Sequence, residues 1–244
     1  MLLSTAYFPP LSWFALAARD MTLSPDRVLP SAVQLEACEH YVKQTYRNRC
    51  YILAGDGVQV LQVPVVHAGG LEEGTFSGAF ARTGSRSDAE EKVPSSRLIT
   101  AVRVDYSTPW LVRTQRALDT AYETSAYYEY YRDGLFALMD TRPQTLWEWN
   151  LMLIRWCLEN LHIACELLPT ASFVPPGSVA DDYRFAIHPK HPDTVLADLG
   201  LGRPYYQVFR DRMGGFTPGL SVLDLLFNEG PDALLYLRPS NVSC

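Results

Sequence analysis

The chain has 244 residues, a length that fits one large domain or two small ones. Hydrophobic residues make up 48% of it, which is ample material for a core. Its formal net charge of −6 argues against general nucleic-acid binding, because that function needs a basic face for the phosphates. No apolar stretch has the length of a membrane helix. The apolar start is broken by Pro9 and Pro10 and lacks a cationic segment, which argues against a signal peptide.

The five cysteines are scattered along the chain without CxxC spacing. An odd number in a chain without an export signal indicates reduced thiols and a cytoplasmic protein. A thiol hydrolase that pairs Cys50 or Cys165 with a histidine is the weakest of the functional hypotheses, because no local arrangement supports it.

The first elements are a short buried strand at residues 2–7 and a helix at 11–18, separated by two prolines. Many open parallel sheets begin with a strand that leads directly into a helix. Functional residues of such folds gather at the carboxyl ends of the strands, where Ser4, Thr5 and Tyr7 would lie. A second strand with a turn is expected at 21–28, and helix or loop at 33–43.

A basic run follows, with Lys43, Arg47 and Arg49 set among Tyr46 and Asn48. One interpretation is a solvated edge strand. The other is an anion site, because guanidinium groups match phosphate or carboxylate in bidentate fashion.

The clearest hairpin joins residues 50–54 to residues 58–66 through a turn at 55–57 that contains two glycines. His67 closes the second strand, as a polar cap or as a site residue. Residues 68–96 are rich in glycine, serine and charge, which is typical of a long loop, either a surface insertion or a lid. No Walker A or dinucleotide-binding glycine pattern occurs in the chain.

The second half alternates strands and helices. Branched residues at 98–106 predict a central strand that ends at Asp105. Helices are expected at 110–124, 125–139 and 145–160. Two further strands are expected at 162–168 and 181–187. Four tyrosines at 127–131 fit helix packing or stacking on a sugar or base. His188 and His191 could bind a metal only with carboxylates from elsewhere, so anion contact by Lys190 and His188 is favoured and no metal site is predicted.

The C-terminal stretch at residues 203–237 is aromatic, then glycine-rich, then helical. Ser221 is a candidate helix N-cap, and Asp224 lies three positions on, where a capping-box acid stands. Gly230 is a stop signal and a proline then begins another short helix. This leaves unexplained the pair Asp224 and Asn228, one turn apart, and the polar run at 205–207.

Several of these stretches resemble the WbqC-like family, named after a protein from a bacterial O-antigen gene cluster. Its C-terminal signature is similar to residues 205–209 and 215–230, and its middle motif to residues 43–49 and 61–65. Residues 2–10 are a degenerate match to its opening strand and aromatic-proline turn. Where the family typically has His-Gln-Pro, this chain has Ser4-Thr5-Ala6, so any acid–base role of that imidazole is missing or has moved.

The resemblance implies a transferase that acts on an activated sugar or an acyl or aminoacyl donor in cell-surface polysaccharide biosynthesis. We expect a small anionic substrate and no nucleic-acid partner, and the sequence names no cofactor. The alternative is a non-catalytic binding or scaffolding module. That alternative predicts no deep pocket where the basic run meets the C-terminal helix, and an Arg49→Ala effect on stability that exceeds its effect on binding.

The candidate site joins two polar clusters across one cavity. Asp224 and Asn228 would be catalytic, either by positioning a hydroxyl or amine or by acting as base. The residues expected to bind substrate come from three parts of the chain: Tyr7, Lys43, Arg47, Asn48, Arg49, Tyr206 and Gln207.

The predicted fold class is α/β, with mixed α+β as the alternative. A central mixed sheet with a β-hairpin would be covered by several helices. We expect a single domain over residues 1–244, with a strand-rich half at about 1–106 and a helix-rich half at about 107–244.

Overall fold

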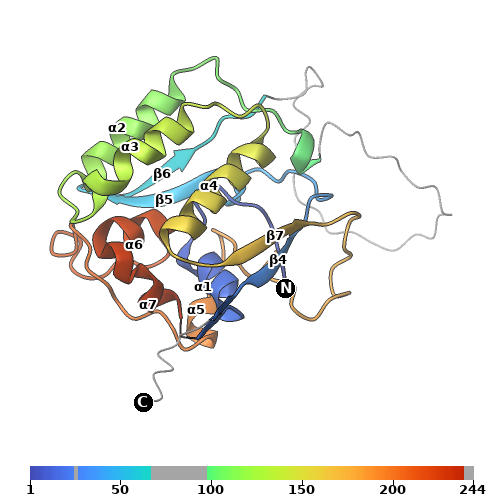
Figure 1. Cartoon of the computed structure of the whole chain (residues 1–244). Coiled ribbons are helices and arrows are strands. Elements are labelled where there is room, and N and C mark those ends of the chain that lie inside the picture. Colours follow the sequence, from blue (N-terminus) through green and yellow to red (C-terminus); the bar gives the residue numbers. More distant parts are fainter. Residues whose placement is uncertain (25–26, 67–97, 239–244) are drawn as a thin grey trace.

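The structure is a computed structural model, and it describes residues 1–24, 27–66 and 98–238 (Figure 1). His67, the loop predicted at 68–96 and the last cysteine lie outside the described residues. Helices alternate with a parallel sheet and two antiparallel hairpins, which confirms the α/β class. The described residues contain no helix with the length and apolar character needed to cross a membrane.

The chain opens with strand β1 (Leu2–Leu3) and helix α1 (Leu11–Arg19), which confirms the predicted order, but the strand expected at 2–7 is limited to its first two residues. Pro10 is the N-cap residue of α1, because its fixed φ suits the entry to a helix and a proline has no N–H group to leave unpaired. Every side chain from Ser12 to Ala18 is buried, so α1 lies inside the molecule.

The parallel sheet has three strands in the order β1-β4-β7, with β4 at Ser31–Leu35 and β7 at Cys165–Pro169. The prediction of helix or loop at 33–43 is therefore wrong over its first residues. The burial of β4 alternates strictly, which is the period of a strand, but the buried polar Ser31 and the exposed apolar Ala32 hide that pattern in the sequence. β1, β4 and β7 end side by side, since Leu3 pairs with Leu35 and Leu35 with Pro169.

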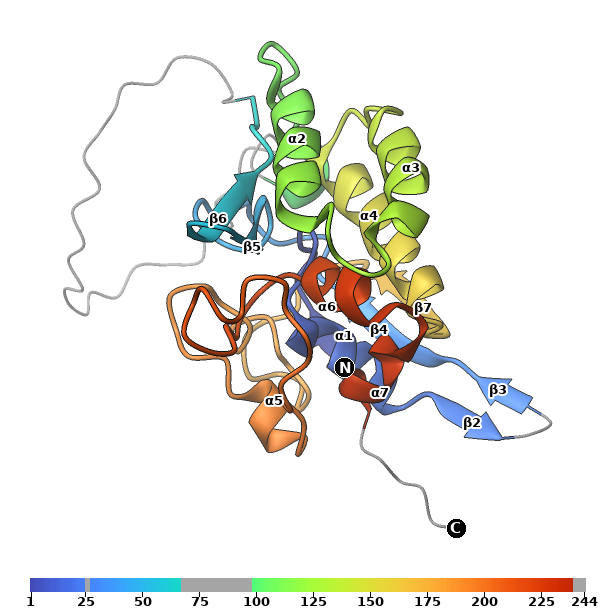
Figure 2. The ribbon, with the colours of Figure 1, turned by 90° about the vertical axis from the view of Figure 1, so that its left-hand side faces the viewer.

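Two hairpins form separate sheets rather than extending the parallel one, so the predicted mixed sheet is wrong as far as the described strands go. Strands β2 (Thr22–Ser24) and β3 (Arg27–Leu29) project from the body of the molecule, as Figure 2 shows. The second hairpin is the one predicted, with β5 at Arg49–Ala54 and β6 at Gly57–Gln62. Gly57 has a φ of 130°, a conformation that favours glycine at the turn.

Three helices lie side by side next to the second hairpin (Figures 1 and 2). They confirm the three helices expected in this region: α2 (Trp110–Tyr122), α3 (Tyr128–Met139) and α4 (Leu146–Asn160). α4 begins with a complete capping box, in which the Thr145 side chain accepts from the Glu148 N–H and the Glu148 side chain accepts from the Thr145 N–H. Its buried face includes Trp149, which packs edge-to-face on Trp110 of α2 at 5.4 Å between ring centroids.

The strand predicted at 98–106 is wrong. The segment holds a 3₁₀ helix, η2 (Ile99–Ala101), and then two isolated bridges, Arg103 with Thr145 and Val104 with Val65. Val102 and Val104 are buried by their neighbours without belonging to a ladder. Branched residues therefore mark burial here, and burial alone does not make a strand.

The strand predicted at 181–187 is also wrong. Asp182 forms one parallel bridge with Leu2, beside β1, and the chain then turns. The turn brings the Arg184 side chain back onto Asp182, as described below, and this local ion pair competes with an extended backbone.

The C-terminal part contains α5 (Val195–Asp198), α6 (Val222–Glu229), the 3₁₀ helix η3 (Gly230–Ala233) and α7 (Leu234–Leu237). Ser221 caps α6 by accepting from the Leu223 N–H, as predicted. The capping-box role of Asp224 is wrong, because its side chain is buried among other partners. Every residue of α6 from Val222 to Asn228 is buried, and α6 contacts α1, α3 and β5, so it is a central element of the core.

Candidate functional site

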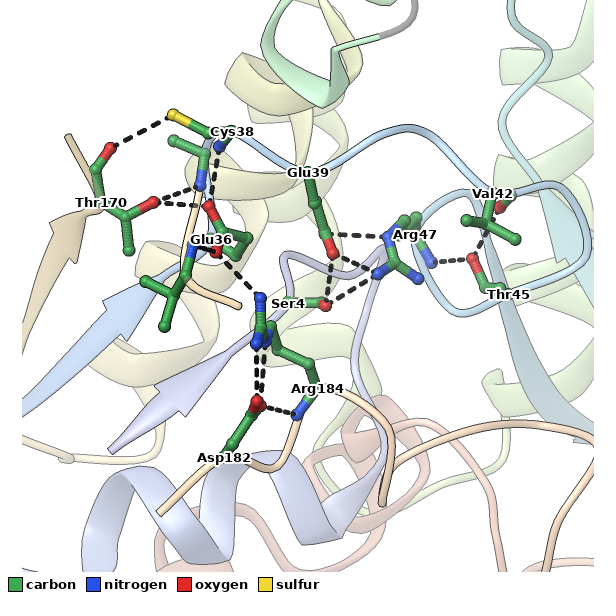
Figure 3. Close-up of polar contacts among 12 residues, drawn as sticks. Ser4, Glu36, Cys38, Glu39, Val42, Thr45, Arg47, Thr170, Asp182 and Arg184 are labelled. Atoms are coloured by element: carbon green, nitrogen blue, oxygen red, sulfur yellow. Dashed lines mark hydrogen bonds and ion pairs between the residues drawn. The ribbon is translucent and has the colours of Figure 1, made fainter. Parts of the chain in front are cut away.

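Three polar residues lie at the carboxyl edge of the parallel sheet, one directly after each strand. They are Ser4 after β1, Glu36 after β4 and Thr170 after β7. This edge is where parallel α/β folds place their functional groups. Figure 3 shows these residues together with the arginines that pair with the nearby carboxylates. We call this group of side chains, defined by Ser4, Glu36, Glu39, Arg47, Thr170, Asp182 and Arg184, the sheet-edge cluster.

Glu36 is fully buried and makes four hydrogen bonds. Its Oε1 accepts from the Thr170 hydroxyl at 2.7 Å and from the Cys38 N–H at 3.0 Å. Its Oε2 accepts from the Val174 N–H and from Arg184 Nη1, both at 2.9 Å. Arg184 reaches Asp182 through Nε at 2.9 Å and Nη2 at 2.6 Å. The cluster is therefore well compensated, as the burial of its charges requires.

Ser4, Glu39 and Arg47 form the second half of the cluster. Arg47 donates to both carboxylate oxygens of Glu39, through Nε at 2.9 Å and through Nη2. The same Nη2 donates to the Ser4 hydroxyl at 2.9 Å, and that hydroxyl donates to Glu39 Oε2 at 3.0 Å. Arg47 thus has its own carboxylate partner, which leaves it little capacity to bind an external anion.

A small cavity of about 20 Å³ lies between the two halves and is lined by Ser4, Thr5, Arg47 and Arg184. The buried Thr5 hydroxyl has no hydrogen-bond partner among the described residues. A polar cavity of this size has room for about one water molecule, which would satisfy that hydroxyl. It does not have room for a substrate.

The basic run also borders a larger pocket of about 430 Å³, which we call the basic pocket. Its lining includes Lys43, Asn48, Arg49, Gln62 and Asp105. Arg49 Nη2 donates to Gln62 Oε1 at 3.2 Å. Within the described part of the chain, no ion pair joins Lys43 or Arg49 to a carboxylate. These two cations therefore keep their charge available to an anionic ligand.

Asp224 lies in the interior with three donors around it. Its Oδ1 accepts from the Tyr122 hydroxyl at 3.0 Å, and its Oδ2 accepts from the Tyr205 hydroxyl at 2.7 Å and from Gln207 Nε2 at 2.9 Å. Burial raises the pKa of Asp224, while the three hydrogen bonds oppose that rise. Gln207 is fixed in turn by Thr217, whose N–H donates to its Oε1 at 2.8 Å.

Asn228 does not meet the Asp224 carboxylate. Its Nδ2 donates to the backbone oxygen of Asp224 at 2.7 Å, across one turn of α6. Tyr7 is completely buried, and burial raises its pKa well above the ordinary value. Tyr206 is 59% exposed, and its backbone N–H donates to Glu229 Oε1.

The two predicted clusters do not share a pocket within the described residues. Lys43, Asn48 and Arg49 are brought together at the basic pocket, whereas Arg47 faces the sheet-edge cluster. Asp224 and Gln207 lie in the core, and only their neighbour Tyr205 reaches a pocket, of about 250 Å³, next to the start of α1. None of the pockets described contains both the basic run and α6, and one cavity between them stays a prediction.

Sequence reasoning missed Glu36, Glu39 and Arg184. Glu36 and Glu39 follow β4, which was assigned to helix or loop, so the sheet edge was not visible there. Arg184 was placed in a strand. No local signal marked the strand end at Glu36, because the alternation of β4 is a pattern of burial that its residue types do not repeat.

No metal site is found in residues 1–24, 27–66 and 98–238, since no three His, Cys, Asp or Glu side chains are grouped to hold an ion. His188 and His191 do lie close together, with ring centroids 5.2 Å apart. Burial and the neighbouring His191, Lys190 and Arg47 lower the pKa of His188.

Comparison with known proteins adds one family. A model of the WbqC-like protein family matches residues 89–190, which include α2, α3, α4 and β7. Neither a curated protein nor a solved structure matches the chain. The matched range contains the tyrosine run and Arg184 but not the stretches at 2–10, 43–49 and 205–230 on which the resemblance was drawn. It nevertheless confirms the resemblance expected from the sequence, because over residues 89–190 the chain is similar to the WbqC-like protein family.

Proposed function

We propose that the chain is a transferase that holds the phosphate or carboxylate of an activated sugar, or of an acyl or aminoacyl donor, in the basic pocket. The transferred group would enter a cell-surface polysaccharide such as O-antigen. The observation that supports this is the pairing of Lys43 with Arg49 on one pocket wall, with no carboxylate partner for either in the described part of the chain. The family match supports the polysaccharide context.

Within this proposal Asn48 and Gln62 supply neutral hydrogen-bonding groups to the donor beside the two cations. The pocket volume of about 430 Å³ falls in the range of small-molecule sites. Arg47 would act indirectly, by fixing the loop from which Lys43 and Arg49 extend through its bonds to Glu39 and Ser4.

Asp224 and Asn228 would serve as positioning residues. Asp224 is enclosed by Tyr122, Tyr205 and Gln207, so its direct contact with a donor in the basic pocket is not part of the proposal. It would hold Tyr205 at the wall of the pocket beside α1. An acceptor with an apolar part would suit that second pocket, whose walls include Leu11, Phe216 and Leu220.

The second candidate function is a binding module without catalysis. It is favoured by one observation, namely that the basic run and α6 line no common pocket among the described residues. A binding module needs only the basic pocket, whereas a transferase needs a second group within reach of the donor.

The first experiment is a ligand screen by thermal unfolding, with nucleotide-sugars, acyl-CoA compounds and amino acids as ligands. A ligand present at a hundredfold excess over its Kd stabilises a protein by about 2.7 kcal/mol, so a true donor raises Tm measurably. We expect Lys43→Ala and Arg49→Ala to remove the shift. Arg155→Ala, at an exposed position on α4, is the matched control and should keep it.

Two results would contradict the proposal. One is that none of the three ligand classes raises Tm. The other is that a ligand raises Tm of the Lys43→Ala/Arg49→Ala double variant as much as it raises Tm of the unchanged chain. A ligand that binds through Lys43 and Arg49 but is never converted, with any acceptor tested by mass spectrometry, would favour the binding module.

A further inference from the structure

An aromatic groove of about 620 Å³ lies where the start of α3 and the end of α4 meet the residues that follow α6. Its walls carry three tyrosines and a tryptophan: Tyr127, Tyr130, Tyr131 and Trp156. We infer that this groove, which we call the tyrosine groove, binds the ring of an uncharged sugar. The site is separate from the basic pocket and goes beyond the transferase proposed above.

The tyrosines at 127–131 have two roles, packing between helices and exposure at the groove. Tyr128 and Tyr131 are buried, at 2% and 5% exposure, and pack among the helices, whereas Tyr130 is 80% exposed. The Tyr131 ring is nearly perpendicular to the Trp156 ring, at 83° with centroids 6.2 Å apart. In such an edge-to-face pair the edge of one ring contacts the face of the other, so the exposed ring of Tyr130 supplies most of the aromatic surface that a ligand can reach. The apolar C–H face of a pyranose ring packs on such aromatic faces.

The polar groups at the groove select against anionic ligands. Glu159, Asn160 and His162 lie at its edge, and no lysine or arginine is among its described lining residues. Asn160 uses its Nδ2 to bond the Trp156 backbone oxygen at 2.8 Å, which leaves its Oδ1 free to accept. A carboxylate and an amide oxygen accept hydrogen bonds from sugar hydroxyls. The same carboxylate repels phosphate, which argues against a nucleotide.

His162 stands where glycine would be the unstrained choice. α4 ends in a Schellman arrangement, in which the His162 N–H donates to the Glu159 oxygen and the Ile163 N–H donates to the Leu158 oxygen. His162 therefore has a φ of 56°. An L residue in this left-handed region costs about 1 kcal/mol relative to glycine. Backbone strain of this kind collects at functional positions, and here it presents an exposed imidazole to the groove.

The wall of the groove that is formed by Tyr127 is held rigidly. Tyr127 donates its backbone N–H to the Phe227 oxygen at 2.9 Å, which ties α3 to α6. Gly230 lies against the Tyr127 ring so closely that a Cβ atom there would be 2.5 Å from it. Rigid aromatic surface lowers the entropy that a ligand must give up on binding. The glycine after α6, which the sequence marked only as a helix stop, thus fixes the ring of Tyr127.

The geometry favours a sugar over a quaternary ammonium ion, which aromatic rings also bind. A cage for such a cation needs separated rings that enclose it. Tyr130 and Tyr131 instead touch edge-to-face, with centroids 4.9 Å apart, and Tyr130 is mostly exposed. The groove is thus an open platform, on which the C–H face of a pyranose chair can rest.

The tyrosine groove lies far from the basic pocket. The groove adjoins the last residues of α4. The basic pocket is near the other end of α4, because it is lined by Asp105, and the N–H of the preceding Val104 donates to the oxygen of Gln144, just before α4 begins. Helix α4 has 15 residues, a length of about 22 Å. One small donor cannot occupy both sites.

The test is saturation-transfer NMR and tryptophan fluorescence on the full chain, with neutral hexoses, N-acetylhexosamines and their disaccharides. We expect at least one neutral sugar to bind, and Tyr130→Ala to weaken its Kd at least tenfold. Tyr130→Phe keeps the ring and should stay within about twofold. Lys43→Ala and Arg49→Ala should leave sugar binding unchanged, so the outcome is independent of the donor pocket. Circular dichroism and Tm confirm that each variant is folded.

The inference is overturned if no neutral sugar binds, or if Tyr130→Ala binds sugar as well as the unchanged chain. It is also overturned if choline binds at this site and sugars do not. Concentration-dependent dimerisation that Tyr130→Ala abolishes, without sugar binding, would show that the groove is instead a contact between copies of the chain.

Discussion

Arg184 and Glu36 are 148 positions apart in the sequence and form an ion pair of 2.9 Å, with side-chain exposures of 1% and 0%. This contact joins the loop after β7 to the end of β4. Because the pair is buried, loss of Arg184 leaves the Glu36 carboxylate without its opposite charge, with only neutral hydrogen-bond donors around it.

We therefore expect Arg184→Met to lower the free energy of unfolding by about 3 kcal/mol or more. Adding Glu36→Gln to that variant should recover part of the loss, because it removes the lone buried charge. Urea unfolding followed by circular dichroism measures both values. Asp181→Asn is the control, since Asp181 pairs with Arg19 at the surface and should cost less than about 1 kcal/mol. If Arg184→Met and Asp181→Asn lowered the free energy of unfolding equally, the buried pair would have no special role in stability.

Substitution of Arg47 and substitution of Arg49 should have different effects on stability, although the two residues are only two positions apart. Arg47→Met leaves the buried Glu39 without its cation and should destabilise the chain by about 3 kcal/mol. Arg49→Ala should change stability by less than about 1 kcal/mol, because its single side-chain bond goes to the exposed Gln62. Urea unfolding and the ligand-induced shift in Tm are measured on both variants. A larger stability loss for Arg49→Ala than for Arg47→Met would support the scaffolding alternative.

Asp224 predicts a pH dependence of stability. Its pKa is raised by burial in the folded chain, so the folded state binds more protons than the unfolded state at pH values between the two pKa values. The stability due to this protonation is complete below the ordinary pKa of an aspartate and is lost as pH rises through the raised value.

The measurement compares the unchanged chain with Asp224→Asn, which does not titrate, by urea unfolding from acidic to neutral pH. The free-energy difference between the two should favour the unchanged chain most at the acidic end and then decline to a plateau. A difference that grows with pH would mean that the hydrogen bonds from Tyr122, Tyr205 and Gln207 outweigh burial and lower the pKa.

His162→Gly should stabilise the chain. The residue has a φ of 56°, where glycine avoids the clash of a Cβ, and the exposed imidazole has little packing to lose. We expect a gain of about 0.5–1 kcal/mol in thermal or urea unfolding. His162→Ala is the comparison, because it removes the imidazole and keeps the strain, so it should bring no such gain.

The cysteines should differ in reactivity. Cys50 and Cys157 are fully buried, and burial raises the pKa of both thiols, whereas Cys38 and Cys165 are partly exposed. Brief alkylation of the native chain, followed by peptide mass spectrometry, should label Cys38 and Cys165 and leave Cys50 and Cys157 unlabelled. Rapid labelling of Cys50 would revive the thiol-hydrolase hypothesis for that residue.

Much of the chain could be predicted because its signals are local. Helix α4 has a capping box and a periodic apolar face within its own residues, and the β5–β6 hairpin has its glycine turn between alternating arms. The Ser221 cap and the proline that begins the next short helix are likewise set by neighbours in sequence. Lys43, Asn48 and Arg49 belong to one run of the sequence and line one pocket, whereas the binding of an anion there stays a prediction.

The tertiary structure decided what burial and distant partners control. Arg47 carries the same charge as Arg49, and only the approach of Glu39 and Ser4 turns it into an internal pair. Asp224 looks like a helix-capping acid until Tyr122, Tyr205 and Gln207 surround it. Val102 and Val104 look like strand residues and are core residues of an irregular segment. Local pattern determines helices, caps and turns because their bonds close within a few residues. The fate of a charge depends on which groups the fold brings to it from elsewhere in the chain.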